Sequence, residues 1–467
     1  MTRELTKGAV MPLLIKFTIP LVLGNLFQLT YNAVDAIIVG NYVGPDALAA
    51  VGICNPVTTL MILFLNGLCI GAAVLMGTQY GRGDHETLRR QVSTTMLAGI
   101  IFSVGLSVLC IIFARPILTF LRTDPTIMDI AVRYLRIILT GLLFTFLYNF
   151  YSSTLRALGD SYTPLFFLIA SAALNIIGDL VFVVLLNTGS DGCAVSTVLS
   201  ELLCCLGCSL YIRKKVPVIY IRKTELKIDR ALLKDTIGYG WASAMQQGTV
   251  QMGKIAVQAV VNTMGVAIAA AFTAVNRIDD FTYIPQQNIA HAMTALMAQN
   301  RGAGEDRRVR EGFLKGMILE LIYGLIVFAV CPLCAVPLMK LFIGNGDAAE
   351  AVGTAGITND AAITGSAASV IAHGVSYLKL IAPMYLLPAV TNGVQGYFRG
   401  MGRLKITLAA SFTNMGVRVA AAMVLVFGFG FGIEALPWSY FAGWIAMMIV
   451  ELPLLFSGLF KRNIQEK

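Results

Sequence analysis

The sequence is poor in charged residues, which excludes an ordinary soluble domain. Only 13% of its 467 residues are Asp, Glu, Lys or Arg, whereas 57% are hydrophobic. Soluble domains average about 25% charged residues, and the mean hydropathy here is +0.75. We therefore predict an all-α polytopic membrane protein, because each spanning helix needs about 20 predominantly apolar residues.

Histidine is scarce, and the cysteines do not form a disulfide pattern. Three scattered histidines offer no metal constellation, and most of the nine cysteines lie in apolar runs, as small hydrophobic residues do. The CPLC at 331–334 has redox-motif spacing but ends an apolar helix instead of following a strand. We predict no cofactor and no metal, apart from Na⁺ at the ion site considered below.

The apolar runs divide the chain into twelve predicted helices. These lie near 12–40, 49–78, 91–114, 127–155, 161–187, 192–212, 233–261, 265–299, 312–339, 370–398, 404–428 and 432–459. Lys and Arg gather at both termini and in alternate loops, most densely at 213–234. The positive-inside rule predicts a multi-pass plasma-membrane protein with both termini cytoplasmic. The net charge of +9 thus reflects topology and gives no reason to expect nucleic-acid binding.

The two halves of the sequence resemble each other. GRGD (81–84) matches GAGE (302–305) at the same offset as Gly44 and Gly265, and STLRALGD (153–160) aligns with GYFRGMGR (396–403) at a larger one. We predict two parallel six-helix repeats. They form an N-lobe (1–212), a cytoplasmic basic linker (213–234) and a C-lobe (235–467) with an extracellular loop insertion near 344–373.

Four polar residues in apolar helices are candidates for chemistry. Asp35 lies in YNAVDAIIVG (31–40), where an ionised carboxylate costs about 2.5–3.5 kcal/mol at the helix centre. Asn175 and Asp179 are four residues apart on one helical face, and Thr197 follows on the next helix. Hard oxygen donors suit Na⁺, and two adjacent carboxylates can retain a proton. We predict one site that couples to H⁺ or Na⁺; buried structural acids are the alternative.

Proline and the asymmetry of the halves complete the pattern. Pro20 lies inside the first predicted helix, where its ring removes a backbone hydrogen bond and favours a bend.

The second half does not repeat the acids, because Ala256 aligns with Asp35 and Arg418 with Asn175. The ion site is therefore expected in the first half alone.

Several segments together resemble the multidrug and toxic compound extrusion (MATE) family, in its prokaryotic DinF-like branch. They are YNAVDAIIVGNYVGPDALAAVG (31–52), GTQYGRGD (77–84), STLRALGDSYTPL (153–165), LNIIGDLVF (174–182), AQNRGAGE (298–305) and YFRGMGRLKIT (397–407). The resemblance implies a cation-coupling site at Asp35, Asn175, Asp179 and Thr197 and a helix-one bend at Pro20. It also implies a substrate cavity that includes Gln28 and Tyr31, to which we add Asn149.

The resemblance further implies a function. A protein of this kind is a secondary active efflux transporter that exports organic, often cationic, amphiphiles by antiport with H⁺ or Na⁺, and is not an enzyme. We expect a monomer that interacts with membrane lipid. A lipid-linked oligosaccharide flippase of the same superfamily is the alternative, whereas GTQYGRGDHETLRR (77–90) fits the signature loop of a major facilitator poorly.

Overall fold

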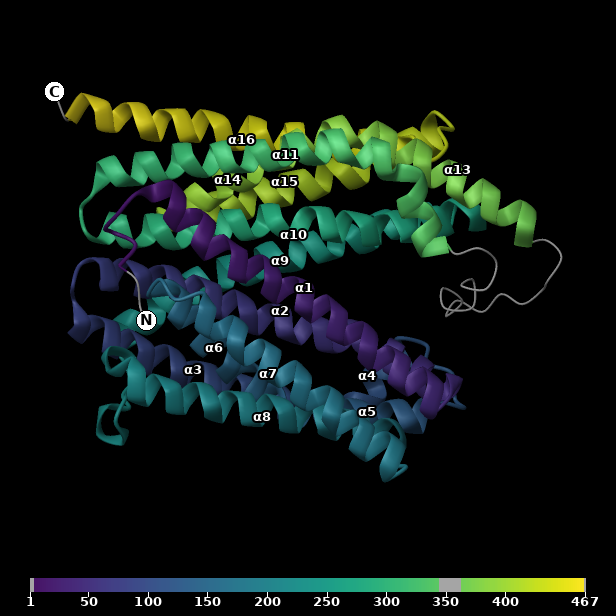
Figure 1. Ribbon diagram of the computed structural model, residues 1–467, viewed down its shortest axis with the longest axis horizontal. Helices are drawn as coiled ribbons and strands as arrows, with labels where there is room; N and C mark the ends of the chain where they lie inside the picture. The colour runs from purple at the N-terminus through teal and green to yellow at the C-terminus, as the bar shows by residue number, and fades with distance from the viewer. Residues whose placement is uncertain (1–3, 344–362, 466–467) are drawn as a thin grey trace. The chain divides into compact units, whose positions relative to one another are not determined.

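The computed structural model describes residues 4–343 and 363–465, and the described chain is helical without strands (Figure 1). The helices are α1 (Val10–Tyr42), α2 (Pro45–Gly81), α3 (His85–Ile112), α4 (Ala114–Phe120), α5 (Met128–Thr140), α6 (Leu142–Ala157), α7 (Tyr162–Asp179), α8 (Gly189–Lys215), α9 (Arg230–Asn262), α10 (Val266–Gly302), α11 (Asp306–Ile343), α13 (Ile363–Ile381), α14 (Leu386–Gly400), α15 (Leu404–Met423) and α16 (Ala435–Gln465).

The helices account for the predicted membrane spans. Within the described ranges, nine segments are long and apolar enough to cross a membrane, or ten if α5 and α6, which bend by 42° at their junction, form one span. The helices α9 and α10 miss this criterion because they carry polar residues such as Gln246, Arg277 and Asp279. Together with these two helices, the segments make up the twelve predicted spans.

The backbone repeats between the halves at the positions that the sequence indicated. Glycines with positive φ occur in aligned pairs, Gly44 with Gly265 (114° and 99°) and Gly83 with Gly304 (72° and 75°). Left-handed backbone of this kind favours glycine because other residues clash through Cβ. Both α7 and α15 continue into a π-helical turn, η1 (Leu180–Leu185) and η5 (Val424–Gly428). The internal repeat is therefore visible in local geometry.

The chain divides into two compact units. Unit 1 contains Met1–Gln247, Ala295–Val309 and Gly400–Gly402, and unit 2 contains Gly248–Thr294, Arg310–Arg399 and Arg403–Lys467. Each has its own buried core. Phe146 and Phe150 lie in that of unit 1, and Phe272, Tyr377 and Trp444 lie in that of unit 2. The units differ from the predicted lobes, since parts of α9 and α10 belong to unit 1.

Two helices of unit 1 approach each other closely through small residues. A Cβ built on Gly67 of α2 would lie 2.3 Å from Cα of Ala244, and one on Gly71 would lie 2.5 Å from the backbone nitrogen of Gly240. Both helices thus present small residues four apart, a spacing that lets helix backbones meet in membranes. Any larger side chain at Gly71 would push α2 and α9 apart.

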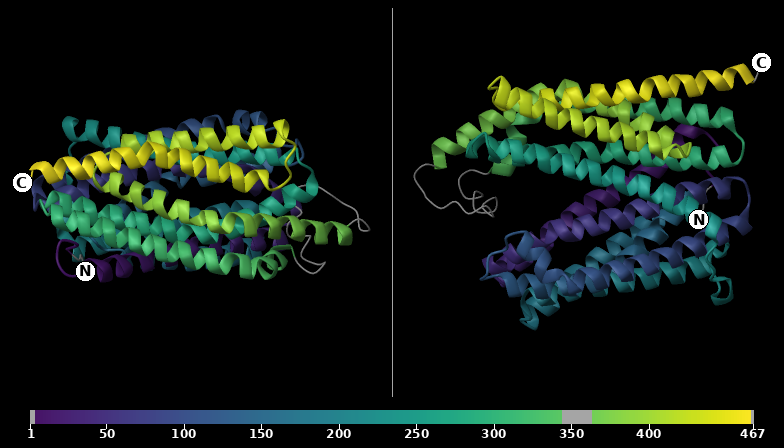
Figure 2. Two further views of the ribbon diagram at one scale, coloured as in Figure 1. Left: turned by 90° about the horizontal axis from the view of Figure 1, so that it is seen from above. Right: turned by 180° about the vertical axis from the view of Figure 1, so that it is seen from behind.

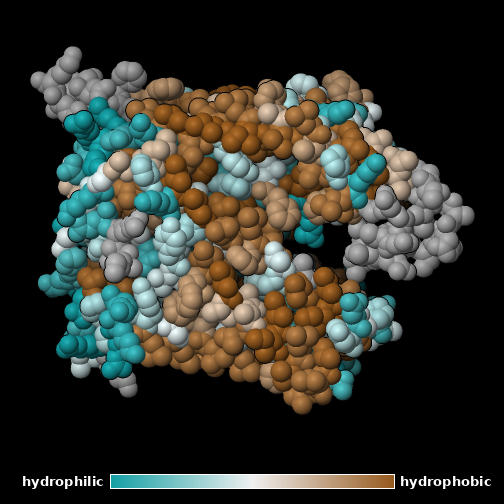
Figure 3. All heavy atoms as spheres, viewed as in Figure 1, coloured by the Kyte–Doolittle hydropathy of each residue, from teal (hydrophilic) through white to brown (hydrophobic). Residues whose placement is uncertain are grey.

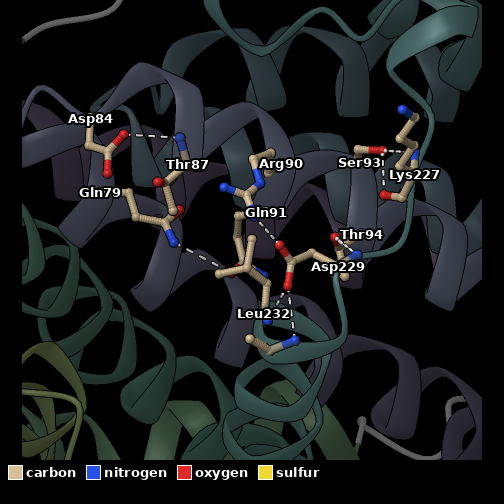
Figure 4. Close-up of polar contacts among 11 residues, drawn as sticks. Gln79, Asp84, Thr87, Arg90, Gln91, Ser93, Thr94, Lys227, Asp229 and Leu232 are labelled. Carbon is tan, nitrogen blue, oxygen red and sulfur yellow. Dashed lines mark hydrogen bonds and ion pairs between the residues drawn. The ribbon is translucent and has the colours of Figure 1, made fainter.

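The basic linker is fixed to α3 by polar contacts (Figure 4). The Asp229 carboxylate accepts hydrogen bonds from the backbone N–H groups of Ala231 (2.9 Å) and Leu232 (3.2 Å) and pairs with Arg90 of α3. Ser93 of α3 donates to the Lys227 carbonyl at 3.0 Å. These contacts cap the start of α9 and hold the linker against α3.

The predicted insertion is described only in part. Residues 344–362 lie outside the described ranges, whereas α13 begins at Ile363, so residues 363–373 are helical and do not belong to a loop.

Figure 2 shows α15 and α16, drawn in yellow-green and yellow, side by side in both further views. Figure 3 shows hydrophobic residues over much of the visible helical surface, and hydrophilic residues mainly along its left edge.

Candidate cation-binding site

Three neighbouring helices of unit 1 carry the predicted ion-site residues. The helix α7, with Asn175 and Asp179, packs against both α1, with Asp35, and α8, with Thr197. Gly178 makes this packing close, because a Cβ at this position would lie 2.4 Å from Oγ of Ser196 on α8. The fold therefore places residues that are far apart in sequence on facing helical surfaces.

Asn175 is the hydrogen-bonding centre of the site. In the amide orientation that satisfies both neighbours, its nitrogen donates to the two carboxylate oxygens of Asp35 at 2.8 and 3.2 Å, and its oxygen accepts from Oγ1 of Thr197 at 3.2 Å. Ser196 donates to the backbone carbonyl of Asn175 at 2.8 Å, which fixes α8 against α7. Asp35, Asn175 and Thr197 thus form one connected chain across three helices.

The two carboxylates differ in access. Asp179 is fully buried, with 0% of its surface exposed, and neither of its oxygens has a hydrogen bond of normal geometry to the described residues. Asp35 is half-buried. A buried carboxylate without donors is costly unless it holds a proton or lies beside a cation. Asp35 is the accessible member of the pair, and Asp179 is the enclosed one.

Glu201 is a further candidate residue, which the sequence pattern alone did not single out. Oγ1 of Thr145 on α6 donates to its carboxylate, and Glu201 lies close enough to Tyr31 of α1 to interact with it electrostatically. Its spacing in the sequence could have identified it, because Glu201 follows Thr197 by four residues and so lies on the same face of α8. The helices that carry the ion site therefore carry a third carboxylate.

The remaining predicted residues occupy varied positions. Gln28 is exposed and hydrogen-bonded to Tyr31, which is half-buried. Asn149 of α6 is half-buried and donates to the backbone carbonyl of Thr145 at 2.8 Å. Pro20 is buried in α1, and the helix continues past it without a break. Gln28, Tyr31 and Asp35 recur at helical spacing along α1 and so lie on one face.

Unit 2 has buried polar residues of its own, arranged differently. Tyr385 donates to Asp279, and Lys254 pairs with Asp280 at 3.4 Å. The Arg418 guanidinium lies 3.9 Å from the centre of the Tyr440 ring, a cation–π contact. No group of three His, Cys, Asp or Glu side chains suited to a metal ion occurs among the described residues of either unit. If the protein binds Na⁺, we therefore expect the ligands to be the oxygen atoms of the Asp35 site.

Comparison with known proteins decides the family. The family model MatE matches residues 20–181 and 242–424, one segment in each half of the chain. The chain belongs to the MatE family. YpnP of Bacillus subtilis, a probable multidrug resistance protein, is 27% identical over 416 residues, covering 89% of this chain and 88% of that protein. YoeA of the same organism, also a probable multidrug resistance protein, is 30% identical over 351 residues, covering 73% and 75%.

Solved MatE-family structures have the same fold. A MATE protein in the bent conformation superposes with a TM-score of 0.88 at 21% identity, covering 99% of this chain and 98% of that one. An outward-facing multidrug resistance MATE transporter gives a TM-score of 0.86 at 21% identity, with the same coverage. The predicted all-α fold of twelve membrane helices in two lobes is confirmed.

Proposed function

We propose that this MatE-family protein exports organic amphiphiles, often cationic, in exchange for H⁺ or Na⁺. The proposal draws on the multidrug resistance named for its relatives and, above all, on the chain Asp35–Asn175–Thr197 beside the enclosed Asp179. Intramembrane carboxylates that line a helix interface mark ion pathways in membrane proteins. The relatives give no support to the oligosaccharide flippase alternative, and no enzymatic step is part of the proposal.

The coupling site works by exchange of one positive charge. With Asp35 ionised, the Asn175 amide stabilises its charge through two charge-assisted hydrogen bonds. With the enclosed Asp179 holding a proton, the pair carries one negative charge, on Asp35. An incoming H⁺ or Na⁺ neutralises that charge and removes the attraction for a cationic substrate. Ion and substrate then compete for the same charge, which is a basis for obligatory exchange. The two lobes alternate their access because each ligand favours a different arrangement.

The difference in access sets an order of events. Asp35 is half-buried and Asp179 fully buried, so an ion that enters from the accessible side meets Asp35 before Asp179. Asn175 and Thr197 supply neutral oxygens along that short path. Tyr31 and Gln28 lie on the same face of α1 and provide a polar edge against which a cationic amphiphile binds. Although α1 continues past Pro20 without a break, the backbone hydrogen bond missing there makes Pro20 the point at which α1 bends when the ion binds.

The experiment is efflux of ethidium from cells that lack their own exporters and express this protein in the plasma membrane. Efflux is measured at fixed pH with and without Na⁺, and then with the proton gradient collapsed by an ionophore. The proposal expects efflux above background that depends on at least one of the two ions. Efflux that persists when both gradients are absent would show that ion exchange does not drive transport.

A further inference from the structure

Two adjoining cavities lie where α1 begins beside the α6–α7 turn of unit 1. The first has a volume of about 230 Å³ and is lined by Lys16 and Phe17 of α1 and by residues 159–163 of the turn. The second, also about 230 Å³, shares Tyr162 and Thr163 with it and is otherwise lined by aromatic residues, Phe166, Phe167 and Tyr211. A polar compartment and an aromatic compartment therefore meet at Tyr162.

Among the residues that the structure describes, Lys16 makes no ion pair. It is exposed on α1 between Ile15 and Ile19, which are 39% and 51% exposed, so it interrupts an apolar outward surface. Among the described residues no carboxylate lies within 4 Å of its ammonium group. Asp160 lines the same cavity, but its carboxylate already accepts bonds from the Tyr162 and Thr163 N–H groups and the Thr163 hydroxyl.

The position of this lysine indicates which ligand supplies the missing charge. The distribution of Lys and Arg predicts that this end of α1 is cytoplasmic, at the level of the lipid headgroups. A lysine near the end of a lipid-facing helix extends its ammonium to the headgroups. Basic pockets between membrane helices on the cytoplasmic side bind phospholipid headgroups. A cavity of about 230 Å³, against roughly 30 Å³ for a water, has room for a phosphate.

We propose that one phospholipid molecule binds here, with its phosphate at Lys16 and an acyl chain against the aromatic compartment at Tyr162 and Phe166. The lipid bridges α1 and the α6–α7 turn, and so contacts the two helices that carry Asp35 and Asn175. The shape of the site favours a lipid over free phosphate. The polar compartment alone would be enough for free phosphate, whereas the adjoining aromatic compartment offers a surface for the acyl chain that only a lipid has.

Native mass spectrometry of the full-length protein in detergent, titrated with phosphatidylglycerol, tests the proposal. The wild type is expected to retain one lipid at concentrations where Lys16→Gln does not, with apparent affinity lowered about fivefold, since a lysine near the membrane contributes roughly 1 kcal/mol. Tyr162→Ala should also weaken retention, because it removes the residue shared by the two cavities. Tyr162 is 57% exposed, so this change should leave folding intact.

Lys214→Gln is the matched control, because Lys214 is an exposed residue in the last turn of α8 that lines neither cavity. It should retain lipid as the wild type does. Equal retention by wild type and Lys16→Gln would overturn the proposal, as would equal loss in Lys214→Gln, which would show a diffuse charge effect. Displacement of the lipid by millimolar inorganic phosphate would overturn it too, by identifying free phosphate as the ligand.

Discussion

Replacing Asn175 by leucine should shift the ion dependence of efflux while leaving a side chain of similar length. Asn175 is 2% exposed and donates to both oxygens of Asp35, at 2.8 and 3.2 Å. Hydrogen bonds to a charged group contribute about 1.5–3 kcal/mol. At about 1.4 kcal/mol per tenfold change, their loss corresponds to roughly a 10- to 150-fold change in the ion concentration that gives half-maximal efflux.

The assay is ethidium efflux from proteoliposomes as a function of Na⁺ at fixed pH, and of pH without Na⁺. If Na⁺ is the coupling ion, half-maximal efflux should require more Na⁺, because the site loses an oxygen ligand. If H⁺ is the coupling ion, the pH of half-maximal efflux should rise by about 1–2 units, since ionised Asp35 loses its donors.

Asn414→Leu is a suitable control for this change. Asn414 is similarly buried, at 4% exposed, but among the described residues its amide nitrogen donates to the sulfur of Met447 and to no carboxylate. Asn414→Leu should leave the half-maximal ion concentration within experimental error of the wild type. An Asn175→Leu protein with unchanged ion dependence for both Na⁺ and H⁺ would refute the assignment of Asn175 to the ion site.

Three further changes test other parts of the structure. Gly71→Val should lower stability by about 1–3 kcal/mol by overpacking α2 against α9, seen in thermal unfolding in detergent, whereas Gly105→Val, where an added Cβ meets nothing within 4 Å, should not. Hydrogen bonds donated by the Leu232 N–H and, to a smaller extent, by Arg90 lower the pKa of the Asp229 carboxyl. Its contribution to linker docking is therefore complete above the unfolded value near 3.9 and lost as pH falls through the lower folded value. Hydrogen exchange of residues 216–229 should thus be insensitive to pH from 8 to 5 after correction for intrinsic rates, and faster in Asp229→Asn at pH 7; unchanged protection in the variant would contradict the docking role. Because Glu201 lies near Tyr31 of the predicted substrate cavity, Glu201→Gln should alter substrate preference more than ion dependence. Efflux of several cationic dyes measures both, and identical profiles would show that Glu201 does not contact substrate.

Much of the fold can be predicted from the sequence, because few backbone structures can span a membrane with all their backbone hydrogen bonds satisfied. Long apolar runs, alternating basic loops and the paired positions Gly44 and Gly265 sufficed to predict twelve helices in two repeats. The break between α5 and α6 was harder, since it occurs at Gly141 inside one continuous apolar run. Residues 363–373 were assigned to a loop because small residues dominate there, yet Ala is the strongest helix former, and α13 begins at Ile363.

The site was predictable in its members but not in its contacts. Spacing placed Asn175 and Asp179 on one face, but nothing in the sequence specified that Asn175 would lie between Asp35 and Thr197. That depends on how closely α7 and α8 pack at Gly178. Glu201 was not identified for the same reason, because its partner Thr145 lies on another helix and becomes evident only in three dimensions.

The central claim, that Asp35 couples ion movement to export, is tested most directly by Asp35→Asn in proteoliposomes. The substitution keeps the size of the side chain and removes its charge. Substrate accumulation against a gradient is measured with an imposed Na⁺ or proton gradient, alongside Asp179→Asn and the double variant. The account predicts that each single variant loses gradient-driven accumulation with normal membrane insertion, and that the double variant is little worse than either. Accumulation by Asp35→Asn at the wild-type rate would contradict the account and leave this carboxylate with a structural role.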